Sequence, residues 1–210
     1  MMTKMSGKNV FKSKRNYVYL ENNLVYKSIT AGDSAALAEA EILRKLYTAA
    51  VNAPQVIEAY GGVIIMEYIE GITLTDVIEC ENISPELLAE RISEWFAAFY
   101  EVFPSKVRGD VNCRNFILTH DNRVFGVDFE DLPIGKKETD LGRLQAFILN
   151  YDPPNTNYKK RLVQALTNCF DARFNIDRAL VDLEQSLEIE RMKKRRDGDK
   201  CGRNESHIII

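Results

Sequence analysis

The sequence lacks several features that would assign it to a specialised class of protein. Its four cysteines are scattered, without a C-x-x-C pair or a neighbouring histidine, which argues against a zinc site and a disulfide framework. No apolar run approaches the length of a membrane span, and residues 1–8 contain no apolar core of signal-peptide length. We therefore expect a protein of the reducing cytoplasm with no membrane association.

The sequence also lacks an excess of charge of either sign. It carries 28 basic and 31 acidic residues, a net charge of −3, which gives no general electrostatic case for binding nucleic acid. We find no internal repeat. The chain has 210 residues, of which 45% are hydrophobic, enough for one large domain or two small lobes around a shared cleft.

Three polar side chains near the middle of the chain are the clearest functional signal. Residues 107–118 read VRGDVNCRNFIL and residues 126–130 read GVDFE, so the polar positions are Asp110, Asn115 and Asp128. The segment between Asn115 and Asp128 reads as a β-hairpin, which brings the start of one strand close to the end of its partner. Two carboxylates and an amide placed together are oxygen donors that suit magnesium, which keeps most of its waters.

An Asp, four residues, an Asn, an apolar strand and then Asp-Phe resembles the catalytic segment of the protein-kinase-like superfamily. The form Gly-Asp-x-x-x-x-Asn with Asp-Phe-Glu is similar to the aminoglycoside and choline phosphotransferase branch. The small atypical protein kinases of the RIO and Bud types are close competitors.

Two other interpretations of these residues are possible. They could be three unrelated turn and cap residues, or residues 108–110 could be a cell-adhesion tripeptide. Agreement of three spaced elements argues against the first, and the absence of other extracellular features argues against the second.

The resemblance implies an α+β, two-lobed protein-kinase-like fold. An N-terminal β-rich nucleotide-binding lobe, an antiparallel sheet with one helix, would span residues 1–70. A mostly helical catalytic lobe would span residues 71–196, and residues 197–210 are predicted to be a disordered tail. The local patterns of apolar and turn residues in the sequence agree with this order of strands and helices. They predict strands at 17–20, 24–29, 54–60, 63–68, 116–119 and 124–127, a weaker strand at 9–11, and helices at 35–50, 73–79, 84–103, 158–172 and 175–195.

Lys27 and Glu39 are the predicted ion pair of the small lobe. Lys27, within LVYKSI, resembles the kinase lysine that contacts the α- and β-phosphates, although a lysine facing outward from an edge strand is a common alternative. Glu39 resembles the helix glutamate that pairs with this lysine. Glu41 is the other candidate, but it points about 200° away around the helix. A buried lysine without a carboxylate would cost several kcal/mol, so the pair should form as a unit.

The resemblance also places the nucleotide. Backbone groups near Glu67 and Ile69 would hold adenine at a lobe boundary over residues 68–71. Kinase-like folds cover the phosphates with a loop between the first two strands, which here reads KSKRN over residues 12–16. It has no glycine, so it departs from the Gly-rich form. Its basic side chains either substitute for the backbone amides or belong to a solvated turn, and the sequence supports both equally.

The stretch after the hairpin bears on the acceptor. Only eleven residues separate Asp128 from Asp140, and no Ala-Pro-Glu follows, unlike a protein kinase regulated by phosphorylation. Asp140 resembles the aspartate of small-molecule phosphotransferases that caps a helix and braces the catalytic loop. The larger lobe lacks the long insertion with which antibiotic kinases hold their drugs, which argues against a bulky aminoglycoside substrate.

These inferences predict an ATP- and magnesium-dependent phosphotransferase that transfers the γ-phosphate to a hydroxyl of a small molecule. Asp110 would orient the acceptor hydroxyl, Asn115 and Asp128 would hold magnesium, and Lys27, fixed by Glu39, would neutralise phosphate oxygens. The alternatives are an atypical Ser/Thr protein kinase and a nucleotide-binding pseudokinase scaffold. The sequence identifies neither the acceptor nor the oligomeric state.

Two further features have ordinary explanations. The basic run at residues 191–196 ends a predicted helix, where cations complement the dipole. It also resembles the basic tail of Bud-type kinases, so contact with RNA or an acidic partner is a minor alternative. Cys113 lies inside the catalytic loop, and we interpret it as an inert packed thiol rather than an oxidation-sensitive one.

Overall fold

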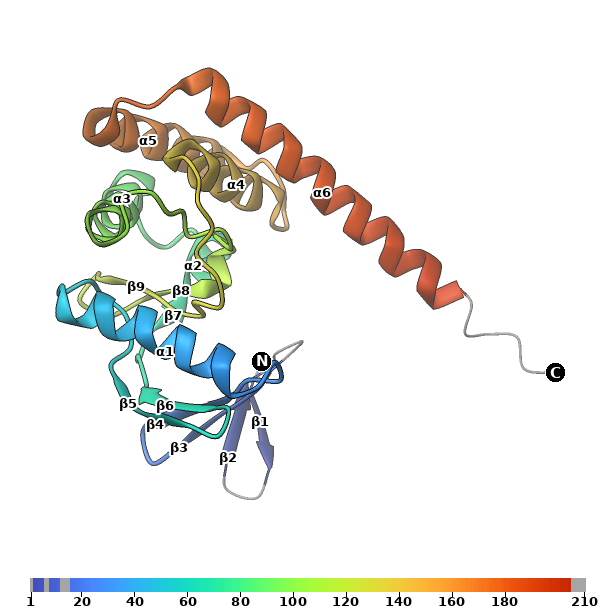
Figure 1. The fold of residues 1–210 in the computed structure, drawn as a ribbon. Coiled ribbons are helices and arrows are strands. Elements are labelled where there is room, and N and C mark those ends of the chain that lie inside the picture. The colour runs from blue at the N-terminus through green and yellow to red at the C-terminus, as the bar shows by residue number, and fades with distance from the viewer. Residues whose placement is uncertain (1, 6–7, 12–15, 205–210) are drawn as a thin grey trace.

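The computed structural model describes residues 2–5, 8–11 and 16–204. Figure 1 shows a small lobe built from the N-terminal strands and helix α1, and a larger lobe in which helices predominate. The proposed phosphate-covering loop falls mostly on residues 12–15, which lie outside the described residues.

The small lobe is one antiparallel sheet covered on one face by a helix. Its strand order is β1-β2-β3-β4-β6-β5, and helix α1, Asp33–Thr48, packs against β5 and β6. The sequence prediction missed the first strand. The strands are β1 Met2–Met5, β2 Lys8–Phe11, β3 Tyr17–Glu21, β4 Leu24–Ser28, β5 Val56–Tyr60 and β6 Val63–Glu67.

Helix α1 begins two residues before its predicted start at residue 35, and its buried face includes Glu39. Its N-cap is Gly32 without a side-chain cap, and the Asp33 carboxylate instead accepts a hydrogen bond from the Gly62 N–H at 3.0 Å. Leu37 and Tyr47 are 44% and 50% exposed, so they lie outside the buried face. The apolar spacing fits two neighbouring faces, and the sheet selects the one that also buries Glu39.

A three-stranded sheet lies between the lobes and carries the hairpin that precedes Asp128 (Figure 1). Its strands are β7 Ile72–Thr73, β8 Phe116–Leu118 and β9 Val124–Gly126, all antiparallel. A Cβ at Gly126 would approach the Trp95 ring to 2.3 Å. A glycine is therefore required where the hairpin packs against the larger lobe.

The larger lobe packs its helices in pairs around an aromatic core. Helix α3, Pro85–Val102, packs on α5, Asn157–Phe174, and α4, Lys137–Asn150, packs on α6, Arg178–Asn204. The shorter elements are α2, Leu74–Cys80, and the 3₁₀ helix η1, Cys113–Asn115. The fully buried aromatic side chains at the centre are Phe96, Phe99, Phe116, Phe129 and Phe170.

Helix α6 continues beyond its expected end near Arg195. It is helical to Asn204, so the first part of the segment expected as a disordered tail is helix. The run of arginines and lysines before it has high helix propensity, and the following glycines do not stop the helix. Figure 1 shows this helix extending away from the rest of the large lobe. Among the helices of the described residues, none is long and apolar enough to cross a membrane.

Candidate active site

The predicted small-lobe ion pair forms and also reaches the large lobe. Lys27 Nζ lies 2.9 and 2.8 Å from the two carboxylate oxygens of Glu39, and both side chains are buried. The same ammonium donates to Asp128 Oδ1. Glu39 Oε1 also accepts the backbone N–H of Phe129 at 3.0 Å. One lysine and one glutamate thus tie the sheet, helix α1 and the Asp-Phe-Glu segment together.

Burial acts against the charge on Lys27, yet the pKa of Lys27 is raised. Desolvation of the ammonium lowers the pKa, and the carboxylates of Glu39 and Asp128 outweigh that effect. Lys27 therefore remains a cation at any physiological pH. A permanent cation beside Asp128 is suited to holding phosphate oxygens.

A second contact between the lobes lies beside this pair. Glu130 Oε1 is 3.9 Å from Lys27 Nζ and accepts a hydrogen bond from Asn16 Nδ2 at 2.6 Å. Asn16 Oδ1 in turn accepts the Thr30 N–H at 3.1 Å. The last residue of the loop where kinase-like folds cover phosphates is thereby bonded to the Asp-Phe-Glu segment.

The catalytic loop presents Asp110 and positions Asn115 through its backbone. Asp110 is exposed, and its Oδ1 accepts the Asn112 N–H at 3.2 Å. Asn115 is buried, and its Nδ2 lies 3.4 Å from the Asp110 carbonyl oxygen. The Val127 N–H donates to the Asn115 carbonyl at 2.9 Å. Because this bond continues the β8–β9 pairing, Asn115 lies beside the strand end that carries Asp128.

Arg108 holds the backbone of the segment around Asp128 through hydrogen bonds. It is 1% exposed, and its Nη2 donates to the carbonyl oxygens of Val127 at 2.5 Å and Asp128 at 2.6 Å. Its guanidinium lies 4.3 Å from the centroid of the Phe129 ring. Asp128 has a positive φ of 67°, a strained conformation for a residue other than glycine, and these contacts help to hold it.

Asp140 braces the catalytic loop, as the resemblance implied, but it does not cap the helix. It lies in the first turn of α4, whose N-cap is Lys136. Its carboxylate accepts the backbone N–H groups of Arg108 at 2.7 Å and Gly109 at 3.0 Å, and the Tyr100 hydroxyl at 2.9 Å. Asp140 is fully buried, so these three donors replace its hydration.

Asp110 and Asp128 line the same cavity of about 690 Å³. Residues of α6 also line this cavity, among them Arg191 and Arg195, which flank the buried carboxylate of Glu188. The basic run at residues 191–196 was predicted only as a helix end, and its place beside the cavity carries no local signal in the sequence. The other lining residues are Arg108, Gly109, Asn112, Arg114, Glu130, Asp131, Pro133, Arg143, Phe147, Met192 and Arg196.

The nucleotide-holding backbone remains a prediction. Glu67 ends β6, where its N–H donates to the Gln55 carbonyl at 2.9 Å, and Ile69 is buried in the connector to β7. Neither residue, both within the described chain, is among those that line the cavity. The structure brings together Lys27, Glu39 and Asp128, and Glu67 lies on β6, the strand that pairs with the Lys27 strand β4.

Asn115 and Asp128 have the donor chemistry for magnesium. The side-chain nitrogen of Asn115 faces the Asp110 carbonyl, which leaves its oxygen as a ligand. The Asp128 side chain is 42% exposed and borders the cavity. Within the described part of the chain, no group of three or more His, Cys, Asp or Glu side chains could hold a metal. Such a site therefore requires further oxygen ligands from phosphate and water, as magnesium usually has.

Comparison with known proteins identifies the family. The sequence profile of the RIO domain matches residues 3–133. The chain belongs to the RIO domain family. A curated relative, the EKC/KEOPS complex subunit BUD32 of Encephalitozoon cuniculi (strain GB-M1), is 29% identical over 134 residues. That alignment covers 64% of this chain and 64% of the relative, so the match spans less than two thirds of either protein.

Solved structures show the same fold at low identity. A choline/ethanolamine kinase family protein from Mesorhizobium loti has a TM-score of 0.54 at 16% identity, covering 86% of each chain. The structure of WbdD has a TM-score of 0.55 at 14% identity, covering 90% of this chain and 52% of that one. These similarities confirm the two-lobed kinase-like fold.

Proposed function

We propose that this RIO-family chain is an atypical protein kinase that transfers the γ-phosphate of ATP to a serine or threonine hydroxyl. The sequence pattern favoured a small-molecule acceptor, whereas the RIO domain match and the BUD32 relative favour a protein acceptor. The observation that carries the proposal is the convergence of Lys27, Glu39 and Asp128 within a RIO domain. Asp110 lines the same cavity as Asp128.

The residues supply positioning and charge rather than covalent chemistry. Lys27 would exchange its contact with Asp128 for phosphate oxygens while Glu39 keeps it in place. Exposed Asp110 would accept a hydrogen bond from the acceptor hydroxyl and take up its proton. Asn115 and Asp128 would hold magnesium, which supplies positive charge against the phosphates when bound.

The test is transfer of radiolabelled phosphate from ATP to the chain itself and to proteins of a lysate. Asp110→Asn and Asp128→Asn should each lower transfer by about 10²-fold or more. Asp110→Asn should keep the unfolding midpoint of the parent, because its side chain is exposed, whereas Asp128→Asn also removes a charge that faces buried Lys27 and should lower the midpoint while the protein still folds. Asp182→Asn, which changes an exposed carboxylate near the start of α6, is the matched control and should transfer normally.

The outcomes separate the competing functions. Transfer to amino alcohols or sugars, and not to proteins, would support a phosphotransferase that acts on small molecules. ATP binding without turnover on any acceptor would indicate a pseudokinase scaffold. Equal transfer by the parent, Asp110→Asn and Asp128→Asn would reject the proposed site altogether.

We also propose that the chain works within a larger assembly, as the name of the relative says of that protein. The basic rim formed by Arg191, Arg195 and Arg196 on α6 would then face substrates or partners at the cavity. Purification of the tagged chain from its own cells should recover the remaining subunits of an EKC/KEOPS complex. Recovery of the chain without them would argue against this part of the proposal.

A further inference from the structure

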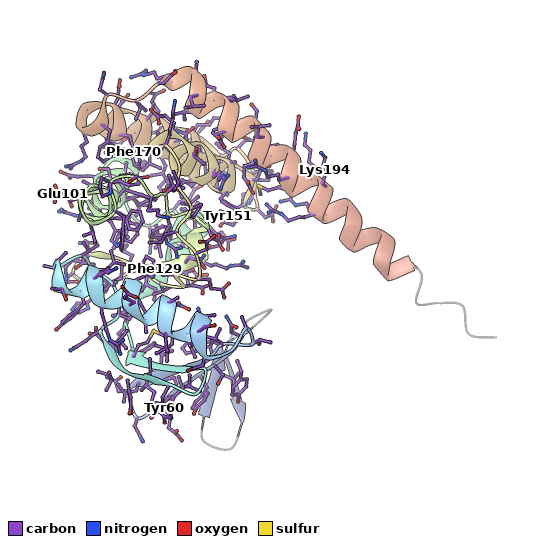
Figure 2. The ribbon with its side chains drawn as sticks, viewed as in Figure 1. Tyr60, Glu101, Phe129, Tyr151, Phe170 and Lys194 are labelled. Carbon is purple, nitrogen blue, oxygen red and sulfur yellow. The ribbon has the colours of Figure 1, made fainter. Side chains whose placement is uncertain are left out.

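A tyrosine far from the catalytic loop in sequence holds that loop in the structure. Tyr151 follows the end of α4, and its hydroxyl accepts the Cys113 N–H at 3.2 Å and donates to Asn112 Oδ1 at 3.1 Å. Figure 2 shows Tyr151 in the large lobe, away from the small-lobe sheet. The hydroxyl therefore contacts the catalytic loop at the Asn112 side chain and at the Cys113 backbone.

Asn112 is the residue through which this contact acts on the site. Its N–H donates to Asp110 Oδ1 at 3.2 Å, and its carbonyl oxygen accepts the Asn115 N–H at 2.8 Å. Its side-chain oxygen also caps the 3₁₀ turn by accepting the Arg114 N–H at 3.2 Å. A shift of Asn112 would therefore move the candidate catalytic carboxylate and the candidate metal ligand together.

Tyr151 is itself held by a buried cation. The Lys159 ammonium donates to the carbonyl oxygens of Tyr151 at 2.9 Å and Pro153 at 2.7 Å. Lys159 is 0% exposed. Burying an ammonium is costly unless its hydrogen bonds are satisfied, so this arrangement fixes the backbone that carries Tyr151.

The Tyr151 hydroxyl stays protonated under all working conditions. Burial raises the pKa of Tyr151 far above its usual value. A protonated hydroxyl both donates and accepts, which the two contacts with Asn112 and Cys113 require. Titration of this group therefore adds no pH dependence of its own.

We infer that Tyr151 is a positioning residue for phosphoryl transfer, acting through Asn112 on both Asp110 and Asn115, with Lys159 as its anchor. This inference rests on the proposed function. A displacement of about 1 Å in a reacting group can lower a rate by about 10²-fold. Loss of the hydroxyl should therefore reduce the rate of transfer without unfolding the protein.

The test compares two tyrosine-to-phenylalanine variants of the full chain. Tyr151→Phe should lower kcat for autophosphorylation by about 10- to 100-fold per folded molecule, with the apparent KM for ATP changed by less than about threefold. Tyr158→Phe is the matched control, because within the described chain its buried hydroxyl has no hydrogen-bond partner. It should keep the parental kcat.

A second variant separates positioning from general destabilisation. Lys159→Met should also lower kcat, and combining it with Tyr151→Phe should lower kcat less than the product of the two single effects, since both act through one chain of contacts. Equal kcat in Tyr151→Phe and Tyr158→Phe, with an active parent, would overturn this inference alone. A parent whose transfer is insensitive to Asp110→Asn would overturn the proposed function and this inference with it.

Discussion

Lys27 on β4 and Asp128 at the end of the catalytic hairpin are 101 positions apart in the sequence and are bonded to each other across the lobes. The same ammonium holds Glu39 of α1. Figure 2 shows Phe129, the neighbour of Asp128, beside α1 at the boundary of the lobes. The relative position of the lobes is thus coupled to the residues proposed to bind phosphate and metal.

Removing Lys27 should separate its structural role from its functional one. Lys27→Met would leave Glu39 buried without its cation and should lower the free energy of unfolding by about 3–5 kcal/mol. Lys27→Met combined with Glu39→Leu should recover much of that stability, because no lone charge stays buried. Neither variant should transfer phosphate.

Urea denaturation and radiolabel transfer measure the two effects. Lys45→Met removes an exposed lysine paired with Glu41 and should change neither the free energy of unfolding nor the rate of phosphate transfer. If the double variant were as unstable as Lys27→Met alone, the uncompensated Glu39 carboxylate would not be the cause of the lost stability.

Arg108 should matter for both the stability of the hairpin and the rate. Arg108→Met would leave the carbonyl oxygens of Val127 and Asp128 without their donor, at a cost of about 1–3 kcal/mol. Because Asp128 would lose part of its support, transfer should fall by about 10- to 100-fold. Thermal unfolding and initial rates test this, with exposed Arg44→Met as the control. A variant with parental activity would show that the Asp128 backbone is held by other contacts.

Magnesium dependence should be set by Asn115 and Asp128. A chelator should stop transfer by the parent, and excess magnesium should restore it. Asn115→Ala should raise the magnesium concentration needed for half-maximal rate by about tenfold or more, while Asn115→Asp, which keeps an oxygen ligand, should raise it less. Exposed Asn168→Ala serves as the control. An unchanged magnesium requirement in Asn115→Ala would remove Asn115 from the metal site.

Cys113 should be unreactive in the folded protein despite its place in the catalytic loop. Burial raises the pKa of the Cys113 thiol to about 12, so at pH 8 roughly one thiol in 10⁴ is ionised, and only the thiolate is nucleophilic. Because the pKa is raised, reactivity should increase only as the pH approaches that value. Alkylation followed by mass spectrometry should modify exposed Cys80 first, and Cys113 only in urea. Equal labelling of both residues in the native state would contradict this expectation.

The short-range signals in the sequence were sufficient for much of the site. The spacing of Asp110, Asn115 and Asp128 predicted a loop and hairpin, which the structure contains. The choice of Glu39 over Glu41 was correct, because helix geometry and the ion pair with Lys27 allow only one of the two to face the sheet. Each of these inferences depended on residues close in sequence or on a family spacing.

The residues that sequence reasoning missed act through side chains that carry no local signal. Arg108 was given no role in the sequence analysis, although its guanidinium supports the Asp128 backbone. Tyr151 reads as a residue after a helix, yet its hydroxyl holds the catalytic loop. The basic run on α6 reads as a helix end, and it borders the cavity.

The sequence alone determined the order of the elements, the ion pair and the polar residues of the catalytic segment, because hydrophobic periodicity and motif spacing are local properties of the chain. Only the tertiary structure decided which face of α1 is buried, where Asp33 and Asp140 direct their carboxylates, and that α6 borders the cavity. Those outcomes depend on which segments pack against each other. Packing, and not the neighbouring residues in sequence, determines which side chain contacts another that lies 40 or 90 positions away in the chain.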